Sequence, residues 1–396
     1  MSISEAVKKE VVAGSAIRKM YEAGFELRAK YGDENVFDLS LGNPIMEPPP
    51  EFDQELRKIL DHPAKGSHRY MLNAGYPETR AAVAAQLKKE TGVNFTVKDI
   101  IMTSGAAAGL NIALKSILNP GEEVIIFAPH WPDYRTFVLN YGCIPKFVPP
   151  DERFMPKVDV LEAILGPKTK AVLFNSPNNP SGAVFSKEIL IQVGELLGKK
   201  EKEYGTTIFL ISDEVYRKLI YDGLTFPFIW DKHPNSIVVT SHSKDLGLAG
   251  ERIGYNAIHP ECRLRDDLSD AFVYCQRTLG YVSASALMQH LVRNLQNVTV
   301  DIADYEKKRN FIYNHLVQMG YAIVKPQGSF FMLPKSPIDN DIAFVEWLRD
   351  EQRVLVVAGR SFGAPGYFRI SFCVTDRELE GSLKGFKAAA LKYGLG

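Results

Sequence analysis

Short apolar runs alternate with longer amphipathic stretches through the middle of the chain. This pattern is typical of strand and helix units built around a mostly parallel sheet. The runs, rich in valine, isoleucine and phenylalanine, predict strands over residues 99–102, 123–128, 171–175, 207–211 and 236–240. Each ends in a polar, glycine-rich or proline-rich loop. Because ligands of open α/β sheets bind at the carboxyl ends of the strands, these loops are the candidate site.

The pattern changes from about residue 278 onward, first to longer helical stretches and then to a strand-like block that ends in the run 367–373. The stretch 6–30 reads as a helix that could pack on this block. We therefore expect an α/β protein with a large domain over 48–285, in which helices flank a mostly parallel central sheet. Residues 1–47 and 286–396 are expected to form a smaller α+β domain. A length of 396 residues suits about two domains.

Composition and charge indicate which kinds of binding partner are expected. Lysine plus arginine equals aspartate plus glutamate at 47 each, so no net charge attracts nucleic acid or an anionic membrane. The charged N-terminus and the lack of a long apolar run predict a cytoplasmic protein without a membrane anchor. The four cysteines are far apart and form no CxxC pair, so we expect neither a disulfide framework nor a metal site. A small-molecule ligand is the partner we expect.

The loop 103–109, Thr-Ser-Gly-Ala-Ala-Ala-Gly, lies between a predicted strand and a helix that runs toward Ile117. Small residues let backbone N–H groups approach an anion, and the N-terminus of a helix favours negative charge. The loop therefore suits a phosphate, although a tight turn with close helix packing explains it equally well.

Two further loops carry polar side chains. The loop 175–182, Asn-Ser-Pro-Asn-Asn-Pro-Ser-Gly, can direct amide groups at a planar polar ligand from a backbone that its prolines restrain. Asp213, directly after a strand, can accept a hydrogen bond from a protonated ring nitrogen, and Tyr216 can donate one to a ring oxygen. An ordinary Asn-Pro turn and a helix cap are the alternatives for these two loops.

The most specific motif is the run 241–254, Ser-His-Ser-Lys-Asp-Leu-Gly-Leu-Ala-Gly-Glu-Arg-Ile-Gly. A partly desolvated lysine has a lowered pKa and reacts with aldehydes, so Lys244 is a candidate nucleophile. Ser241 and Arg252 have side chains that can hold a phosphate.

In order and spacing, these motifs resemble those of the class I and II aminotransferases, which are fold-type I pyridoxal-phosphate enzymes. The resemblance covers nearly the whole chain, and within the family the sequence is similar to those of bacterial aspartate aminotransferases. It implies a fold-type I transferase with pyridoxal 5'-phosphate as cofactor. Lys244 then corresponds to the Schiff-base lysine, Asp213 to the partner of the pyridine nitrogen, and Asn179 and Tyr216 to the partners of the phenolic oxygen.

The resemblance implies further site residues. Trp131 corresponds to the aromatic ring against the cofactor, and the phosphate cradle corresponds to Gly105, Ala106 and Ala107 with Ser241 and Arg252. Gly42 and Arg369, with Asn179, correspond to residues that bind the substrate's α-carboxylate. Tyr70 corresponds to a tyrosine that reaches the phosphate of the neighbouring subunit, which implies a homodimer with shared active sites.

The implied reaction is a ping-pong transfer of an amino group between an L-amino acid and a 2-oxo acid, with Lys244 as tether and then as base. Our first prediction for the pair is aspartate with 2-oxoglutarate. Lys115 falls roughly where some bacterial aspartate aminotransferases place a lysine for the distal carboxylate, although a lysine on a solvated helix face explains it at least as well. An alanine, aromatic or broad-range aminotransferase is the alternative. His242 replaces an apolar residue of the family pattern, and it could touch the phosphate or only fill space.

Two other classes of protein are alternatives to an aminotransferase. A pyridoxal-phosphate C–S lyase would use the same cofactor residues, and release of ammonia without an oxo-acid acceptor would distinguish it. A transcription regulator built on this fold would need an added helix-turn-helix domain, for which the chain has no spare length. A nicotinamide-dependent dehydrogenase is disfavoured because no GxGxxG motif follows a strand.

Overall fold

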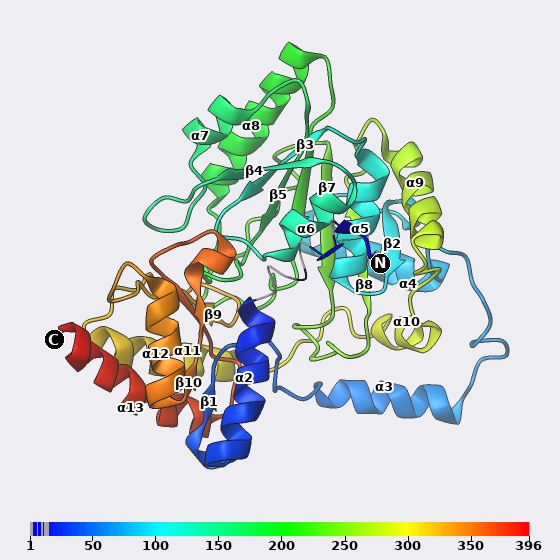
Figure 1. Ribbon diagram of the computed structural model, residues 1–396. Coiled ribbons are helices and arrows are strands. Elements are labelled where there is room, and N and C mark those ends of the chain that lie inside the picture. The colour runs from blue at the N-terminus through cyan, green and yellow to red at the C-terminus, as the bar shows by residue number, and fades with distance from the viewer. Residues whose placement is uncertain (1–2, 6, 9–10, 12–15, 396) are drawn as a thin grey trace.

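The computed structural model describes residues 3–5, 7–8, 11 and 16–395 (Figure 1). Its centre is a seven-stranded sheet in the order β2-β8-β7-β6-β5-β3-β4. Neighbours pair in parallel from β4 to β7, while β8 runs antiparallel to both β7 and β2. The strands are β2 (Ile100–Thr103), β3 (Glu123–Phe127), β4 (Ile144–Val148), β5 (Thr169–Asn175), β6 (Phe209–Asp213), β7 (Ser236–Ser241) and β8 (Gly254–Ile258). The predicted, mostly parallel α/β sheet is confirmed.

Helices cover both faces of this sheet (Figure 1). Alternate residues of one strand point to opposite faces, so Ile125 and Phe127 of β3 enter one core and Val124 and Ile126 enter the other. The core on the first face also receives α4 (Pro77–Thr91), α8 (Lys187–Tyr204) and α10 (Ala286–Val292). The core on the opposite face receives α5 (Ala106–Ile117), α6 (Asp133–Asn140) and α9 (Arg265–Thr278). A sheet buried on both faces explains why its strands read as continuous apolar runs.

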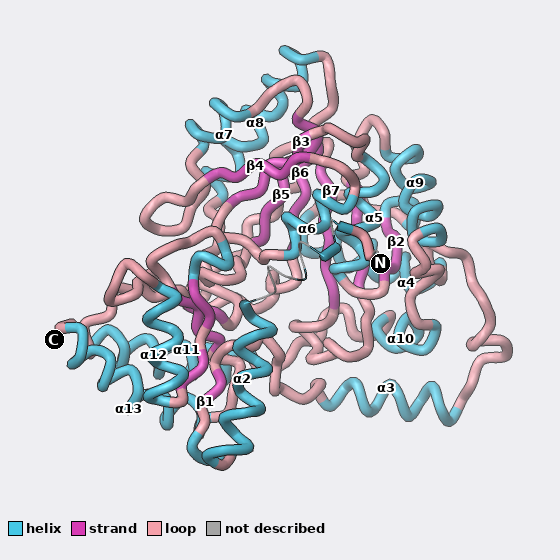
Figure 2. Tube along the Cα trace, viewed as in Figure 1, coloured by secondary structure: helices cyan, strands magenta, loops and turns pink. Residues whose placement is uncertain are grey.

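A further set of helices and strands builds a separate core, the second core, in the lower left of Figure 2. A three-stranded sheet, β11 (Val357–Ala358), β12 (Phe368–Ser371) and β9 (Phe331–Met332), lies within it. Around it pack α2 (Ala16–Tyr31), α11 (Ile302–Gln318), α12 (Asp341–Gln352) and α13 (Asp376–Tyr393). The short strand β1 (Phe37–Asp38) pairs in parallel with β10 (Val354–Leu355), which joins the N-terminal segment to the C-terminal block. The remaining helices are α3 (Pro50–Asp61) and α7 (Val158–Ile164).

The helix predicted over 6–30 is present as α2, and its earlier part falls largely on residues outside the described ones. Met20 and Leu27 of α2 pack in the C-terminal core, as expected. Met288, Leu291 and Val292 of α10 instead pack in the core of the large sheet, although they follow the predicted boundary at 285. The division into two domains therefore stays a prediction.

Two strands of the sheet had no counterpart in the predicted set. β4 lies at the edge, where Ile144 and Phe147 are 47% and 41% exposed, and it includes Pro145, a residue tolerated at a sheet edge. β8 begins at Gly254 and contains the buried Asn256, whose amide donates to the carbonyl of Gly109 in α5 at 2.9 Å. Asn256 interrupts the apolar run from which a strand would be predicted, and its hydrogen bond fixes α5 against the sheet.

Among the described residues, none of the helices has both the length and the apolar content needed to cross a membrane.

Candidate active site

A cavity with a volume of about 300 Å³ opens where the carboxyl ends of the central strands meet the second core. Except for Gly105, Tyr70, Lys115 and His242, every residue considered for the site lines it: Gly42, Ala106, Ala107, Trp131, Asn179, Asp213, Tyr216, Ser241, Lys244, Arg252 and Arg369. The cavity wall also includes residues not predicted from the sequence, namely Ile17, Tyr134, Asn175, Val215, Ser243, Ala249 and Phe331. Side chains spread over more than 350 positions of the chain thus face one space.

Lys244 lies in the turn that follows β7, and its side-chain amine donates a 2.9 Å hydrogen bond to the carbonyl of Gly42. Burial, together with the positive charges of Arg252 and Arg369, lowers the pKa of Lys244 to about 8, against an opposing effect of Cys373. A lysine of this pKa is partly uncharged near neutral pH, which is the form that attacks a carbonyl carbon.

Asp213 is the last residue of β6 and is buried. Its Oδ2 accepts a 2.6 Å hydrogen bond from the hydroxyl of Tyr134, while Oδ1 has no partner among the described residues. Burial raises the pKa of Asp213 to about 6, against the opposing hydrogen bond from Tyr134. Asn175 donates to the backbone carbonyl of Asp213 at 2.9 Å, so the neighbouring strand β5 holds the strand end in place. An unpartnered buried carboxylate oxygen suits a cationic donor.

One end of the cavity suits a phosphate. Gly105 precedes α5 with a φ of 80°, and a Cβ on it would lie 2.8 Å from Nη2 of Arg252. The N-terminus of α5, with Ala106 and Ala107, faces the cavity beside Arg252. Ser241 and Ser243 share a hydrogen bond of 3.1 Å at the same end. Backbone donors, two hydroxyls and a guanidinium in one place form an anion site.

Arg369 reaches the cavity from β12 and is almost fully buried. Its guanidinium donates to Oδ1 of Asn179 at 3.1 Å and to the carbonyl of Ser40, and it lies between the rings of Phe331 and Phe362. Burial lowers the pKa of Arg369 to about 10. Its Nε has no partner among the described residues. A buried guanidinium with an unpaired donor suits a carboxylate.

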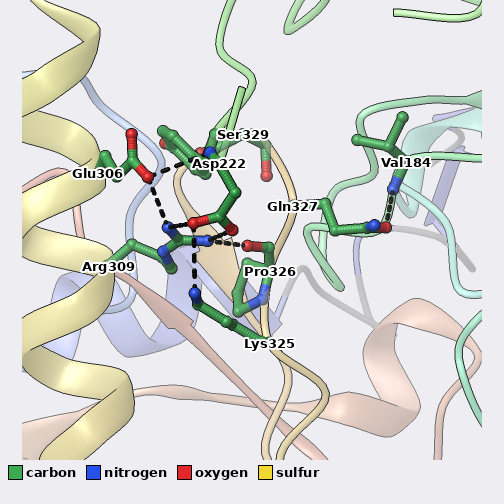
Figure 3. A network of polar contacts seen from close by, with 9 residues as sticks. Val184, Asp222, Glu306, Arg309, Lys325, Pro326, Gln327 and Ser329 are labelled. Atoms are coloured by element: carbon green, nitrogen blue, oxygen red, sulfur yellow. Dashed lines mark hydrogen bonds and ion pairs between the residues drawn. The ribbon is translucent and has the colours of Figure 1, made fainter. Parts of the chain in front are cut away.

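The segment 325–331 carries Phe331 to the cavity, and a polar network holds its start (Figure 3). Arg309 of α11 forms a double hydrogen bond to Asp222, at 2.8 and 2.9 Å, and donates to the carbonyl of Pro326 at 2.7 Å. Farther along, Ser329 donates to the carbonyl of Asn178 at 3.1 Å, next to Asn179. The network thus fixes both Phe331 and the asparagine loop.

Three sequence expectations fall outside the cavity. Lys115 is exposed, with its amine over the ring of Tyr141 at 5.4 Å, and it does not line the cavity, so a role beside a distal carboxylate stays a prediction. The nine-residue separation from Ala106 corresponds to about 13 Å along α5. His242 does not line the cavity and instead contacts Asp245, with Nδ1 3.2 Å from Oδ2. Tyr70 lies between α3 and α4 and is 93% exposed.

Comparison with known proteins agrees with this geometry. The sequence model of the family described as aminotransferase class I and II matches residues 34–385. A probable aspartate/prephenate aminotransferase from Thermus aquaticus is 30% identical over 98% of this chain and 99% of its own. Aromatic-amino-acid aminotransferase 2 from Thermococcus litoralis is 31% identical over 96% of both chains. A solved structure of an amino transferase from Eubacterium rectale, 38% identical, covers 99% of both chains with a TM-score of 0.96.

Proposed function

Because the chain belongs to the class I and II aminotransferases, we propose that it uses pyridoxal phosphate to move an amino group from an L-amino acid to a 2-oxo acid in a ping-pong reaction. The single observation that carries the proposal is the convergence of Lys244, Asp213 and Arg369 on one cavity. An aldehyde-reactive amine, a buried carboxylate and a buried guanidinium are the three groups that this chemistry requires.

The cavity fits the cofactor. The anion site at the N-terminus of α5 would hold the phosphate, and a side chain at Gly105 would collide with Arg252 there. The unpartnered Oδ1 of Asp213 would accept a hydrogen bond from the protonated ring nitrogen, and Asn179 and Tyr216 would contact the phenolic oxygen. Trp131 would lie against the ring. When bound, the cofactor draws electrons from the substrate's Cα and so makes the proton on that carbon acidic.

The residues of the chain then have separate roles in the proposed reaction. Arg369 binds the α-carboxylate through its guanidinium, with Gly42 and Asn179 beside it, and so orients the Cα–H bond. Lys244 would first hold the cofactor covalently. Its freed amine would then accept the Cα proton of the donor and pass it to the aldehyde carbon of the cofactor within the same half-reaction, and the reverse transfer would protonate Cα of the new amino acid in the second half. Phe331 and Val215 help to keep water from the cavity wall.

A pH dependence follows from the pKa of Lys244. With burial lowering this pKa to about 8, the amine is protonated and unreactive below that pH and uncharged above it. We expect the rate at which cofactor-free protein forms its covalent bond with pyridoxal phosphate to rise from pH 7 to pH 9 and then level off. Stopped-flow absorbance measures this rate. A rise centred above pH 10 would contradict the buried setting of the amine.

Replacement of Arg369 by lysine tests the proposed carboxylate site. A lysine keeps one charge but cannot make the paired hydrogen bonds, so we expect kcat/KM for the amino donor to fall by about 10- to 100-fold, equivalent to roughly 1.5–3 kcal/mol. Arg349→Lys is the matched control, because Arg349 pairs only with Asp350 among the described acidic side chains and lies outside the cavity. Equal activities of the two variants would remove Arg369 from the site.

The identity of the amino donor is a separate part of the proposal. The names of similar proteins favour aspartate, the first predicted donor, and also an aromatic donor. Among the described lining residues, the cations are Lys244, Arg252 and Arg369, and all three already have proposed partners. Because Lys115 lies elsewhere, none of these is left for a second carboxylate. The charges therefore favour a donor with an apolar or aromatic side chain, facing residues such as Ile17 and Phe331.

Initial rates with a panel of donors test this choice. We expect kcat/KM for phenylalanine or leucine to exceed that for aspartate by about 10-fold, because a second carboxylate would lose water without gaining a cation. Higher activity with aspartate would support the first predicted donor and contradict this one.

Assembly, location and domain division complete the proposal. We propose a homodimer in which the exposed Tyr70 reaches the phosphate site of a neighbouring subunit. The cytoplasm is the proposed location. The core around β9, β11 and β12 would form the smaller domain, and the large sheet with its helices would form the larger one.

A further inference from the structure

Buried and half-buried charged side chains form a cluster next to the cavity in sequence but not in its lining. The cluster consists of Glu90, Glu214, Arg217, Lys218, His242 and Asp245. Four of its members directly follow a cavity-lining residue in the chain: Glu214 follows Asp213, Arg217 follows Tyr216, His242 follows Ser241 and Asp245 follows Lys244. The loops after β6 and β7 thus supply one side chain to the cavity and the next to the cluster.

Within the cluster, Asp245 is the residue that directly follows Lys244 in the chain. Its Oδ2 lies 3.2 Å from Nδ1 of His242 and 3.3 Å from the amine of Lys218. Because His242 and Asp245 flank Lys244 at a spacing of three residues, their contact closes the turn 242–245 from behind.

The turn is also tied to the chain that leads into the second core. The Lys218 amine donates to the carbonyls of Gln296 and Val298, at 2.7 and 3.1 Å, in addition to its ion pair with Asp245. The backbone carbonyl of Asp245 accepts a 2.7 Å hydrogen bond from Val300, whose side chain packs in the second core. Asp245 therefore joins the turn to the segment 296–300 through its side chain and through its backbone.

The cluster holds Asp245 as a carboxylate. Although burial raises its pKa, the charges of His242 and Lys218 hold the pKa of Asp245 well below its usual range. A buried ion pair of this kind contributes little net stability against an apolar replacement, but removal of one partner leaves an unpaired group. The arrangement is better explained by the geometry that it imposes on the turn than by stability.

We propose that Asp245 is a positioning residue for Lys244: through His242, Lys218 and the segment 296–300 it fixes the turn so that the Lys244 amine points into the cavity. The inference rests on the proposed role of Lys244 in holding the cofactor. It assigns His242 a place behind the site, as the partner of Asp245, and no contact with the phosphate.

The test uses full-length Asp245→Asn, which keeps the shape of the side chain and removes its charge. Cofactor-free protein is mixed with pyridoxal phosphate, and the rate of covalent bond formation is followed by absorbance across pH. Borohydride reduction and peptide mass analysis then locate the modified lysine. Asp99→Asn is the matched control, because Asp99 is also a buried carboxylate but caps a turn before β2, at the far end of that strand from Thr103.

A misplaced amine reacts more slowly at every pH, so we expect the plateau rate of Asp245→Asn to fall on the order of 10²-fold while its midpoint pH stays that of the wild type. Asp99→Asn should keep the wild-type rate even if it melts at a similarly lowered temperature. His242→Asn, which removes a single contact, should slow the reaction about 10-fold and decides the question if Asp245→Asn does not fold.

An unchanged plateau in Asp245→Asn, or a loss no larger than that of Asp99→Asn, would overturn the positioning role. A shifted midpoint with a normal plateau would overturn it as well, since Asp245 would then act on the charge of Lys244. If the wild-type protein itself shows no borohydride-trapped cofactor on Lys244, the proposed function fails first.

Discussion

Replacement of Lys244 by alanine is expected to lower kcat for transamination by about 10⁴-fold, the upper range for loss of a positioned general base. The substitution removes the amine that would hold the cofactor and the group that would move the Cα proton. It leaves the buried Asp213 and Arg369 in place, so the purified variant should still bind pyridoxal phosphate without forming a covalent bond. Steady-state kinetics and borohydride trapping measure the two losses separately.

Lys115→Ala is the control for this experiment. Lys115 is exposed and outside the cavity, so its removal should leave kcat and the KM for aspartate unchanged. A raised KM for aspartate in this variant would support the distal-carboxylate role, which the position of Lys115 outside the cavity does not favour. Normal transamination by Lys244→Ala would remove the central residue of the proposed mechanism.

Replacement of Asp213 by asparagine should lower kcat by about 10³-fold, because breaking one partner of a buried ion pair costs roughly 3–5 kcal/mol. The amide keeps the shape of the carboxylate but cannot hold a proton on the ring nitrogen of the cofactor. Since burial raises the pKa of Asp213 to about 6, the wild-type carboxylate is charged above that pH, and cofactor binding should weaken as the pH falls through 6.

Tyr134→Phe is the variant to compare with Asp213→Asn. Loss of its hydroxyl removes one hydrogen bond to Oδ2 of Asp213 and leaves the negative charge, so kcat should fall only about 10-fold. Measured rates that are equal for Asp213→Asn and Tyr134→Phe would mean that the charge of Asp213 has no special part in catalysis.

Much of the site could be predicted from the sequence, because its chemistry lies on loops that directly follow strands. Asp213 ends β6, and the turn with Lys244 follows β7, so a strand pattern and a local motif were enough to find both. Parallel neighbours then bring these strand ends together without any knowledge of distant contacts.

The residues that were missed depend on tertiary contacts. Tyr134 reaches Asp213 across 79 positions of sequence, and Phe331 enters the cavity on a segment that the Arg309 network holds. Neither has a local motif. Lys115 lies outside the cavity because the rise of the helix carries its side chain to the far end of α5, a distance that sequence proximity to the phosphate loop does not reveal. β4 and β8 were missed because Pro145 and Asn256 interrupt their apolar patterns.

The most direct test of the central claim is a single half-reaction. Purified protein loaded with pyridoxal phosphate is mixed with one amino donor and no oxo acid, and the oxo-acid product and ammonia are counted per active site. A ping-pong aminotransferase releases one equivalent of oxo acid, retains the nitrogen and stops until a second oxo acid is added. Continued turnover with release of ammonia would instead establish a lyase, and no product from any donor in the panel would contradict the proposed reaction.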